Sequence, residues 1–343
     1  MKALVIHAAH DLRLEERAVT EPGPGEVLVR LAVGGVCGSD LHYYHHGGFG
    51  AVRLREPMIL GHEVAGHVAA LGSGVTGLAV GDLVAVSPSR PCGGCRYCLE
   101  GLANHCLNMR FYGSAMPFPH SQGAFRQSLV ADAAQCIPAL GLTAGAAAMA
   151  EPLAVALHAT RRAGEILGKR VLITGSGPIG QLCILAARRA GAAEIVAVDL
   201  ADFTLGLAVI SGADRVINTG KVPEALAEYG ADKGYFDLLF ECSGVASALV
   251  AGIGAMRPRG VIMQLGLGGD MALPMMAITA KELDLRGSFR FHSEFALAVG
   301  LMQKRLIDVT HLITHSVPLA EAETAFRLAS DRGTAMKTQI VFA

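Results

Sequence analysis

Four cysteines lie in one 15-residue window of this chain and have the spacing C-x2-C-x2-C-x7-C. They are Cys92, Cys95, Cys98 and Cys106. Four thiolates in one loop can complete a tetrahedral shell around zinc, leaving no coordination position for a substrate. The alternative of an iron–sulfur site is disfavoured, because the usual bacterial spacing ends in C-x3-C-P, which is absent. The spacing therefore predicts a structural zinc rather than four unligated cysteines.

A second set of metal-binding side chains is dispersed along the first 151 residues. Its members are Cys37 in Val-Cys-Gly-Ser-Asp-Leu-His, His62 and Glu63 in Leu-Gly-His-Glu, and Glu151 in Ala-Glu-Pro-Leu. Each lies beside an expected turn, so all four could project into one cleft. A sulfur, an imidazole and carboxylate oxygens would hold zinc while leaving a position for water or a substrate oxygen. Singly these residues are weak signals, since a lone cysteine is more often buried packing.

A glycine-rich turn follows the apolar stretch 171–174 and precedes an expected helix over 178–190. It reads Gly175-Ser176-Gly177-Pro178-Ile179-Gly180. Such glycines allow a tight turn and close approach of a pyrophosphate to the helix N-terminus. Asp199 ends the next expected strand, where an acid accepts ribose hydroxyls and repels a 2′-phosphate. The pattern predicts NAD in preference to NADP, against the alternative of an ordinary α/β turn with a strand-end Asp.

The elements that must position these residues change character along the chain. Up to about residue 145, short strands are interrupted by turns, which predicts an irregular, partly barrel-like β domain. After residue 151, continuous apolar strands alternate with helices, which predicts a doubly wound parallel sheet. In the first part, strands are expected over 1–7, 26–33, 63–71 and 81–87. In the second they are expected over 171–174, 195–198, 215–218, 237–241, 260–265 and 283–288, and a final strand over 338–342.

Length and composition agree with a two-domain α/β protein. We expect the 343 residues to form two domains. A catalytic zinc domain would comprise residues 1–145 and 290–343, and a dinucleotide-binding domain residues 146–289. Hydrophobic residues make up 52% and charged residues 17%, which excludes extensive disorder. A net charge of -1 without long basic blocks disfavours nucleic-acid and membrane partners. No signal peptide or membrane span is expected, so we expect a cytoplasmic protein.

These motifs together resemble the zinc-containing medium-chain alcohol dehydrogenase family over the whole chain. That resemblance implies a GroES-like catalytic domain beside a Rossmann domain. Glu151 stands where alcohol dehydrogenases have a second cysteine ligand, and with the run Cys37–Tyr43 it resembles the sorbitol dehydrogenase branch. More narrowly, the strings 109–120 and 285–295 are similar to those of L-idonate 5-dehydrogenases.

The resemblance also implies a role for individual residues. Cys37, His62 and Glu63 correspond to ligands of the catalytic zinc, while Glu151 contacts the metal or holds its water. Ser39 and His42 correspond to a relay that takes the alcohol proton to solvent. The substrate cleft would be lined by Tyr43, Phe111 and Arg290, with Arg110 and His292 as further polar groups.

Structural interpretations of the same residues stay open at this point. Ser39 could cap a helix, because serine is common at helix N-termini. His42 could be a surface histidine among His45 and His46. Arg290 could pair with Glu294 on one helix face.

The function that follows is a zinc-dependent oxidoreductase that passes a hydride from a polyol-type secondary alcohol to NAD. The two ligand sets, one closed and one open, predict two Zn²⁺ per chain. The resemblance implies a homotetramer and reversible oxidation of L-idonate to 5-keto-D-gluconate. A sorbitol or xylitol dehydrogenase is the first alternative. A zinc-free quinone or enoyl reductase, or a non-catalytic zinc- and dinucleotide-binding protein, would share the fold but should lack the dispersed ligand set.

Overall fold

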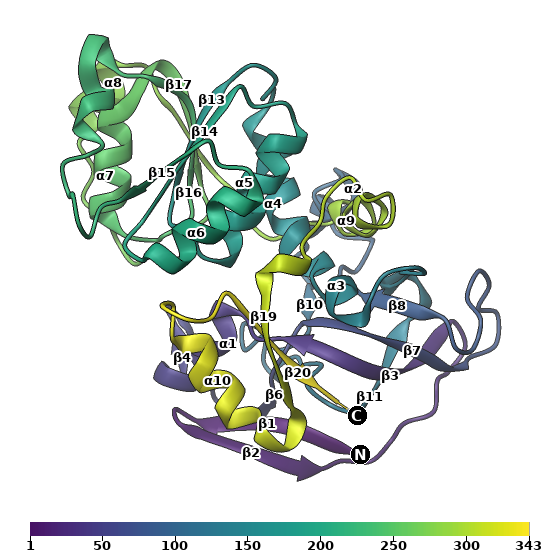
Figure 1. Cartoon of the computed structure of the whole chain (residues 1–343). Coiled ribbons are helices and arrows are strands. Elements are labelled where there is room, and N and C mark those ends of the chain that lie inside the picture. Colours follow the sequence, from purple (N-terminus) through teal and green to yellow (C-terminus); the bar gives the residue numbers. More distant parts are fainter. Residues whose placement is uncertain (343) are drawn as a thin grey trace. The chain divides into compact units, whose positions relative to one another are not determined.

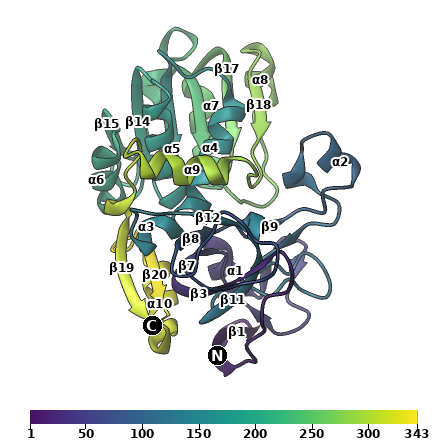
Figure 2. The same cartoon turned by 90° about the vertical axis from the view of Figure 1, so that its right-hand side faces the viewer.

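The structure is a computed structural model that describes residues 1–342 and divides the chain into two compact units (Figures 1 and 2). Unit 1 comprises Met1–Glu151, Phe295–Asp331 and the chain from Lys337 onward. Unit 2 comprises Pro152–Glu294 and the short piece Arg332–Met336. The domain boundaries predicted from the sequence, 145/146 and 289/290, lie a few residues before these. Residues 332–336 were predicted to belong to the catalytic zinc domain with the rest of the C-terminal segment.

Unit 1 is built on an extended, mostly antiparallel sheet. Its strands in spatial order are β12 (Cys136–Pro138), β8 (Leu83–Val86), β7 (Glu63–Leu71), β3 (Glu26–Gly35), β20 (Lys337–Val341) and β19 (Ile313–Pro318), with β11 (Ser128–Asp132) also paired to β3. Alternate residues of β3, Val27, Val29 and Leu31, are buried because successive side chains of a strand point to opposite faces. The strand β20 pairs with β3, so the C-terminal strand lies in the N-terminal unit.

Smaller elements complete unit 1. A three-stranded sheet has the order β2 (Asp11–Glu16), β1 (Lys2–Ala8) and β6 (Met58–Ile59), and two-residue pairs join β9 (Ser89–Arg90) to β10 (Arg110–Phe111) and β4 (Gly48–Phe49) to β5 (Val52–Arg53). The helices are α1 (Gly38–His46), α2 (Arg96–Leu99), α3 (Ala144–Ala148) and α10 (Ala322–Ser330), and α9 (Glu294–Gln303) lies in this unit from Phe295 on. Residues from distant parts of the chain, among them Phe125, Phe326 and Phe342, share one core.

Unit 2 is a six-stranded sheet in which every neighbouring pair is parallel. Its order is β15 (Arg215–Asn218), β14 (Glu194–Asp199), β13 (Arg170–Thr174), β16 (Phe236–Glu241), β17 (Met256–Gln264) and β18 (Asp284–Gly287). In chain order this is 3-2-1-4-5-6, the arrangement that binds dinucleotides where the strand order reverses. The prediction of a β-rich domain followed by a doubly wound sheet is confirmed.

Helices cover both faces of the sheet in unit 2 (Figure 1). The helices α5 (Pro178–Arg189) and α6 (Asp202–Ser211) pack on one face, and α7 (Ala246–Ala255) packs on the other, next to α8 (Met275–Ala280). Most of α4 (Ala150–Ala163) also belongs to this unit. Within residues 1–342, no helix combines the length and the apolar character that a membrane span requires.

Several strands were not predicted, among them β2, β11 and β19, and one predicted strand begins at a different residue. The strand β17 begins at Met256 rather than residue 260, because Met256 already pairs with Phe236. The register then shifts past Arg257-Pro258-Arg259, and regular pairing resumes at Val261 opposite Leu238. The strand β19, Ile313–Pro318, was not predicted. Its sequence Ile-Thr-His-Ser-Val-Pro is neither continuously apolar nor cleanly alternating, and its pairing with β20 is what defines it.

Candidate functional site

The four clustered cysteines of unit 1 converge in the structure. Their sulfur atoms all lie within 4.8 Å of one another, and the Cys95–Cys98, Cys95–Cys106 and Cys92–Cys106 separations are 3.5, 3.9 and 3.4 Å. A tetrahedral zinc site with Zn–S bonds of about 2.3 Å would place its sulfurs about 3.8 Å apart. None of the cysteines within residues 1–342 forms a disulfide. The four-sulfur set therefore fits a closed zinc site.

The backbone around these cysteines is arranged to stabilise thiolates. The amides of Cys92 and Asn108 donate to Cys106 Sγ, and the amide of Leu107 donates to Cys95 Sγ. A hydrogen bond from the Asn108 side chain is the main reason why the pKa of Cys92 falls to about 6. Burial and the neighbouring cysteines raise the pKa of Cys98 to about 12, so the four thiols cannot all ionise easily without a cation. A divalent cation would remove that conflict.

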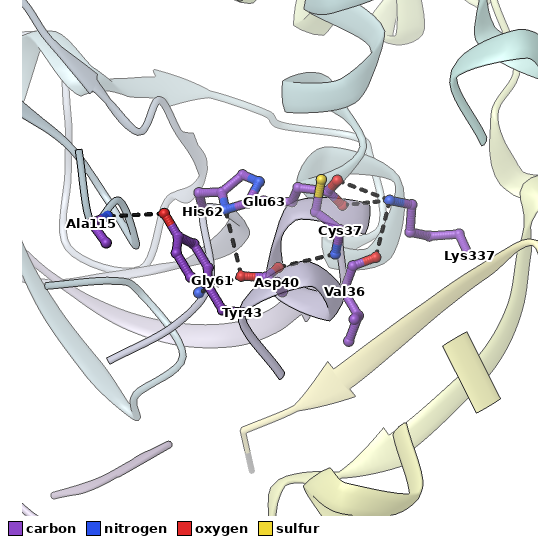
Figure 3. Close-up of polar contacts among 9 residues, drawn as sticks. All are labelled: Val36, Cys37, Asp40, Tyr43, Gly61, His62, Glu63, Ala115 and Lys337. Carbon is purple, nitrogen blue, oxygen red and sulfur yellow. Dashed lines mark hydrogen bonds and ion pairs between the residues drawn. The ribbon is translucent and has the colours of Figure 1, made fainter. Parts of the chain in front are cut away.

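The dispersed set meets elsewhere in unit 1 (Figure 3). Cys37 is the N-cap of α1, His62 precedes β7, and Glu63 is the first residue of β7. One ligand atom from each lies within 4.8 Å of the others. His62 and Glu63 are buried and Cys37 is partly buried, so the set has one sulfur, one imidazole and one carboxylate at a largely desolvated point. This is the donor chemistry of an open zinc site.

Asp40 supports this set from within α1. Its carboxylate is fully buried and accepts hydrogen bonds from the amides of Cys37 at 3.0 Å and Gly61 at 3.1 Å. His62 Nδ1 lies 3.8 Å from Asp40 Oδ1 and has no closer polar partner among the described residues (Figure 3). Nε2 is therefore the ring nitrogen turned away from the carboxylate. Metal-binding histidines typically direct their second nitrogen to such a carboxylate.

A buried lysine pairs with the acid of the set. Lys337 Nζ lies 2.8 Å from both Glu63 carboxylate oxygens and donates a longer bond to the carbonyl of Val36. The side chains of Lys337 and Glu63 are 3% and 1% exposed. Burial opposes the charged ammonium, but Glu63 and Cys37 outweigh it and raise the pKa of Lys337. Glu63 thus has a charged partner on β20, the last strand in chain order.

The electrostatics of Cys37 test whether a cation fits. Burial, followed by the negative charge of Glu63, raises the pKa of the Cys37 thiol to about 12. The same kind of desolvation raises the pKa of Asp40. Anionic groups gathered out of water are unfavourable unless a positive charge joins them, and a metal cation deprotonates a coordinating thiol. The residues present fit a catalytic zinc.

Glu151 does not join the compact group that Cys37, His62 and Glu63 form. It is the second residue of α4 and is buried. Burial raises its pKa to about 8, with His62 lowering it and Glu63 raising it, so the carboxyl is close enough to sense the set. Both predicted roles of Glu151, direct contact with the metal or holding its water, therefore stay predictions.

The predicted relay and substrate residues of unit 1 lie on or near α1. Ser39 is the second residue of α1, so the alternative that it caps the helix is wrong; Cys37 occupies that position. Ser39 and His42 are three apart and share a helix face. The Phe111 ring lies 5.7 Å from the His62 ring. Tyr43 is 2% exposed, and its hydroxyl accepts a hydrogen bond from the Ala115 amide (Figure 3).

The glycine-rich turn of unit 2 has the space that the motif implies. Gly175 has φ +83°, and an added Cβ would meet the Ser243 backbone at 2.7 Å. At Gly180 a Cβ would meet the Gly175 carbonyl at 1.9 Å, so the helix packs directly against the turn. A Cβ on Gly177, the N-cap of α5, would meet nothing within 4 Å. Open space beside the N-terminus of a 12-residue helix that begins with Pro178 and Ile179 suits a phosphate.

Asp199 ends β14 beside this turn. Its carboxylate accepts hydrogen bonds from the amides of Ser176 at 2.6 Å, Leu200 at 2.7 Å and Ala201 at 3.2 Å. An ionised carboxylate has about four acceptor positions, so capacity for a ribose hydroxyl is left. The position and charge fit the expected role in selecting the cofactor.

Arg290 lies in unit 2, in the loop after β18, and is not in a helix. Its guanidinium lies 5.0 Å from the centre of the Phe289 ring. The alternative in which Arg290 pairs with Glu294 on a helix face has no support here, because Glu294 pairs with Arg161 and His158. His292 is exposed and its amide donates to Glu294, while the exposed Arg110 donates to the carbonyl of Pro119.

Two residues of the dispersed site were missed by the sequence reasoning. Asp40 lies inside the Cys-Gly-Ser-Asp motif, where the three-residue spacing from Cys37 signals a capping interaction. Lys337 is separated from Glu63 by 274 positions. A lone lysine at the start of a β-strand carries no local signal of burial, and only the pairing of β20 with β3 brings it to the site.

Comparison with known proteins gives matches across both units. Residues 23–141 match the family model of the alcohol dehydrogenase GroES-like domain, and residues 178–304 match that of the zinc-binding dehydrogenases. L-idonate 5-dehydrogenase (NAD(P)(+)) of Escherichia coli K12 is 45% identical over 317 residues, covering 92% of this chain and 91% of the relative. Sorbitol dehydrogenase of Gallus gallus is 37% identical, covering 98% and 95%.

A solved structure shares the whole fold. The crystal structure of Escherichia coli L-idonate 5-dehydrogenase superposes with a TM-score of 0.95 at 42% sequence identity. The match covers 99% of this chain and 98% of that one.

Proposed function

The chain belongs to the zinc-dependent alcohol dehydrogenase family, and from that membership we propose that it oxidises L-idonate to 5-keto-D-gluconate with NAD, reversibly. Zinc and NAD(P) are the cofactors of that family, and the protein is an oxidoreductase acting on a small-molecule alcohol. The observation that carries the proposal is the meeting of Cys37, His62 and Glu63 in a chain 45% identical to an L-idonate 5-dehydrogenase.

Zinc bound by Cys37, His62 and Glu63 would supply Lewis-acid activation that lowers the pKa of a substrate hydroxyl. The Asp40 carboxylate lies 3.8 Å from His62 Nδ1, on the side of the ring where it favours one orientation, and Lys337 balances the Glu63 charge. These supporting contacts pre-organise the ligands, so little reorganisation is needed when substrate binds.

The protein must also remove the hydroxyl proton. Ser39 and His42 lie on one face of α1, and both are partly exposed, whereas Asp40 between them is buried. We infer that the Ser39 hydroxyl accepts the alcohol proton as it donates its own proton to His42, which then releases a proton to solvent, because histidine exchanges protons near neutral pH. In unit 2, the open turn at Gly177 would receive the pyrophosphate, and Asp199 would hold the ribose. The nicotinamide chemistry belongs to the cofactor itself.

Recognition of a sugar acid is assigned to Arg290. A guanidinium binds a carboxylate through two parallel hydrogen bonds, a geometry that a neutral polyol does not offer. The test compares L-idonate, L-gulonate, sorbitol and xylitol with NAD in the unmodified protein and in Arg290→Ala. We expect L-idonate to be preferred, and the substitution to reduce kcat/KM for L-idonate far more than for sorbitol. A clear preference for a neutral polyol would refute the L-idonate assignment and leave the zinc chemistry intact.

A neutral polyol is the second candidate substrate class. It is supported by the 37% identity to sorbitol dehydrogenase over nearly the whole chain. The same substrate comparison decides between the two candidates. A homotetramer is proposed from the sorbitol dehydrogenase resemblance, and light scattering coupled to size exclusion measures it directly.

A further inference from the structure

The loop that carries Arg290, residues 288–293, leaves unit 2's sheet at its ligand-binding edge. It follows β18, which is parallel to β17 and, through β16, to β13. The carboxyl ends of all these strands therefore lie along one edge, and the glycine-rich turn follows β13 at that edge. Ligands of doubly wound sheets bind there. Arg290 is thus on the side of unit 2 where the cofactor is expected.

The backbone of Arg290 needs external support. Its φ is +54°, in the left-handed region that residues with a Cβ seldom occupy. Such a conformation persists where the surrounding contacts determine it. Before Arg290, the Ser288 amide donates to the carbonyl of Gln264 at 3.0 Å. After it, Phe291 is fully buried, and the His292 amide donates to Glu294 Oε2 at 3.0 Å.

Glu294 is the anchor on the C-terminal side of the loop. Its side chain is 7% exposed, and Oε1 accepts a hydrogen bond from Arg161 Nη1 at 2.9 Å. His158 Nδ1 lies 3.5 Å from the same oxygen, and Arg161 Nη1 also donates to Ser293 Oγ at 3.0 Å. Burial opposes ionisation, but the contacts with His158, the His292 amide and Arg161 outweigh it and hold the pKa of Glu294 well below its usual value. The ionised carboxylate therefore accepts hydrogen bonds from Arg161 of α4 and from the His292 amide of the loop.

A purely structural role would also use an acid at this position. Glu294 is the first residue of α9, and negative charge is favourable near a helix N-terminus. That role stabilises the helix alone. It requires neither Arg161 nor the bond to the His292 amide, and it does not reach the loop backbone two residues from Arg290.

We propose that Glu294, held by Arg161 and His158 of α4, is a positioning residue that fixes the Arg290 loop and thereby sets discrimination between acidic and neutral polyols. This inference rests on the proposed function, in which Arg290 contacts the substrate carboxylate. The α4 side chains act through Glu294, Glu294 acts through the loop backbone, and only Arg290 meets the substrate.

The test is a double-mutant cycle on the ratio of kcat/KM for L-idonate to kcat/KM for sorbitol. The ratio is measured in the zinc-loaded protein, in Glu294→Gln, in Arg290→Ala and in the double variant. Since a misplacement of about 1 Å can cost up to about 10²-fold in rate, we expect Glu294→Gln to lower the ratio about tenfold. In the Arg290→Ala background the further change should be less than about twofold, because residues acting as one unit are not additive.

Controls separate positioning from folding. Glu165→Gln removes an equal charge from an exposed residue just after α4 and should leave the ratio unchanged. Arg161→Met alters a half-exposed side chain and tests the same anchor if Glu294→Gln fails to fold. Hydrogen exchange of the peptide over 288–293 should accelerate in Glu294→Gln and Arg161→Met, but not in Glu165→Gln.

The outcomes are distinct. A lowered ratio that is non-additive with Arg290→Ala supports the inference. If Arg290→Ala lowers the ratio while Glu294→Gln and Arg161→Met reduce activity equally with both substrates, the inference is overturned and the proposed function stands. If Arg290→Ala itself leaves the ratio unchanged, the role of Arg290 in the proposed function fails, and this inference fails with it.

Discussion

Glu63 and Lys337 form an ion pair with almost no contact with water, at a point where a zinc ligand is also expected. The desolvation of two charges offsets most of their attraction, so such a pair adds little net stability. Removing one partner, however, leaves an uncompensated buried charge. The lysine therefore gives the Glu63 carboxylate a charged partner whether or not a cation is bound.

This balance predicts the behaviour of Lys337→Met. Loss of one member of a buried pair should lower the free energy of unfolding by about 3–5 kcal/mol. The loss should be smaller in zinc-loaded than in chelator-treated protein, because the cation gives the Glu63 carboxylate another partner. Urea unfolding with and without chelator measures both. The control Lys221→Met removes a lysine that is 66% exposed and pairs with Asp202, where exposed pairs contribute about 0–1 kcal/mol. Equal stability of the two variants would contradict the assigned role.

Glu294 gives a residue-scale prediction about pH. Its pKa in the folded protein lies below the unfolded value of about 4.3, so its contribution to stability is present above that pH. It is lost as the pH falls and the folded carboxylate is protonated. The free energy of unfolding should therefore fall more steeply in the unmodified protein than in Glu294→Gln on acidification from about pH 5 to about pH 3. Denaturant unfolding at several pH values tests this, and parallel pH curves for the two proteins would refute it.

At the scale of elements, the turn between β13 and α5 is specified by local sequence. Gly175 and Gly180 admit no side chain, Gly177 leaves open space, and Asp199 sits beside them at the end of β14. The glycines belong to one contiguous motif in a strand–turn–helix context, and Asp199 ends the next strand, which is why these residues could be identified without the structure. The same is true of the four-cysteine loop, whose ligands lie within one short window.

Cofactor choice is the prediction that belongs to this turn. Asp199→Ala should lower kcat/KM for NAD and raise kcat/KM for NADP relative to that for NAD. The change removes both an acceptor for ribose hydroxyls and a charge that repels a 2′-phosphate. Ratios of kcat/KM for the two cofactors measure the effect, with Asp202→Ala as a charge-matched control three residues along. Comparable efficiency with NAD and NADP in the unmodified protein would show that the expected preference is wrong.

Other features depend on pairing that sequence patterns do not encode. Lys337 gains its role only when β20 aligns beside β3, and β19 becomes a strand only through β20. Glu151 was assigned to the metal site from its motif, yet whether an acid ligates or stands beside the ligands depends on distances of a few ångströms. Arg290 was predicted to line the substrate cleft, with a pair to Glu294 on a helix face as the alternative. Its left-handed backbone in a loop could not be read from the sequence.

At the scale of the whole molecule, the two units divide the chemistry. Both cysteine-containing metal sets lie in unit 1, and the dinucleotide turn with Asp199 lies in unit 2. The order of the chain does not follow this division, since the strand carrying Lys337 returns to unit 1 after unit 2 is complete. One closed and one open zinc site in the same unit are expected to differ in function. The closed site should support folding and the open site should support turnover.

The most direct test of this account is the zinc content per chain, measured by elemental analysis alongside alcohol-dependent NADH formation. The unmodified protein should hold two zinc ions per chain. His62→Ala should hold one and stay folded without turnover, whereas Cys95→Ser should hold one and be destabilised, because the binding energy of a structural site is folding energy. Fully active protein that holds one zinc ion or none would contradict the account.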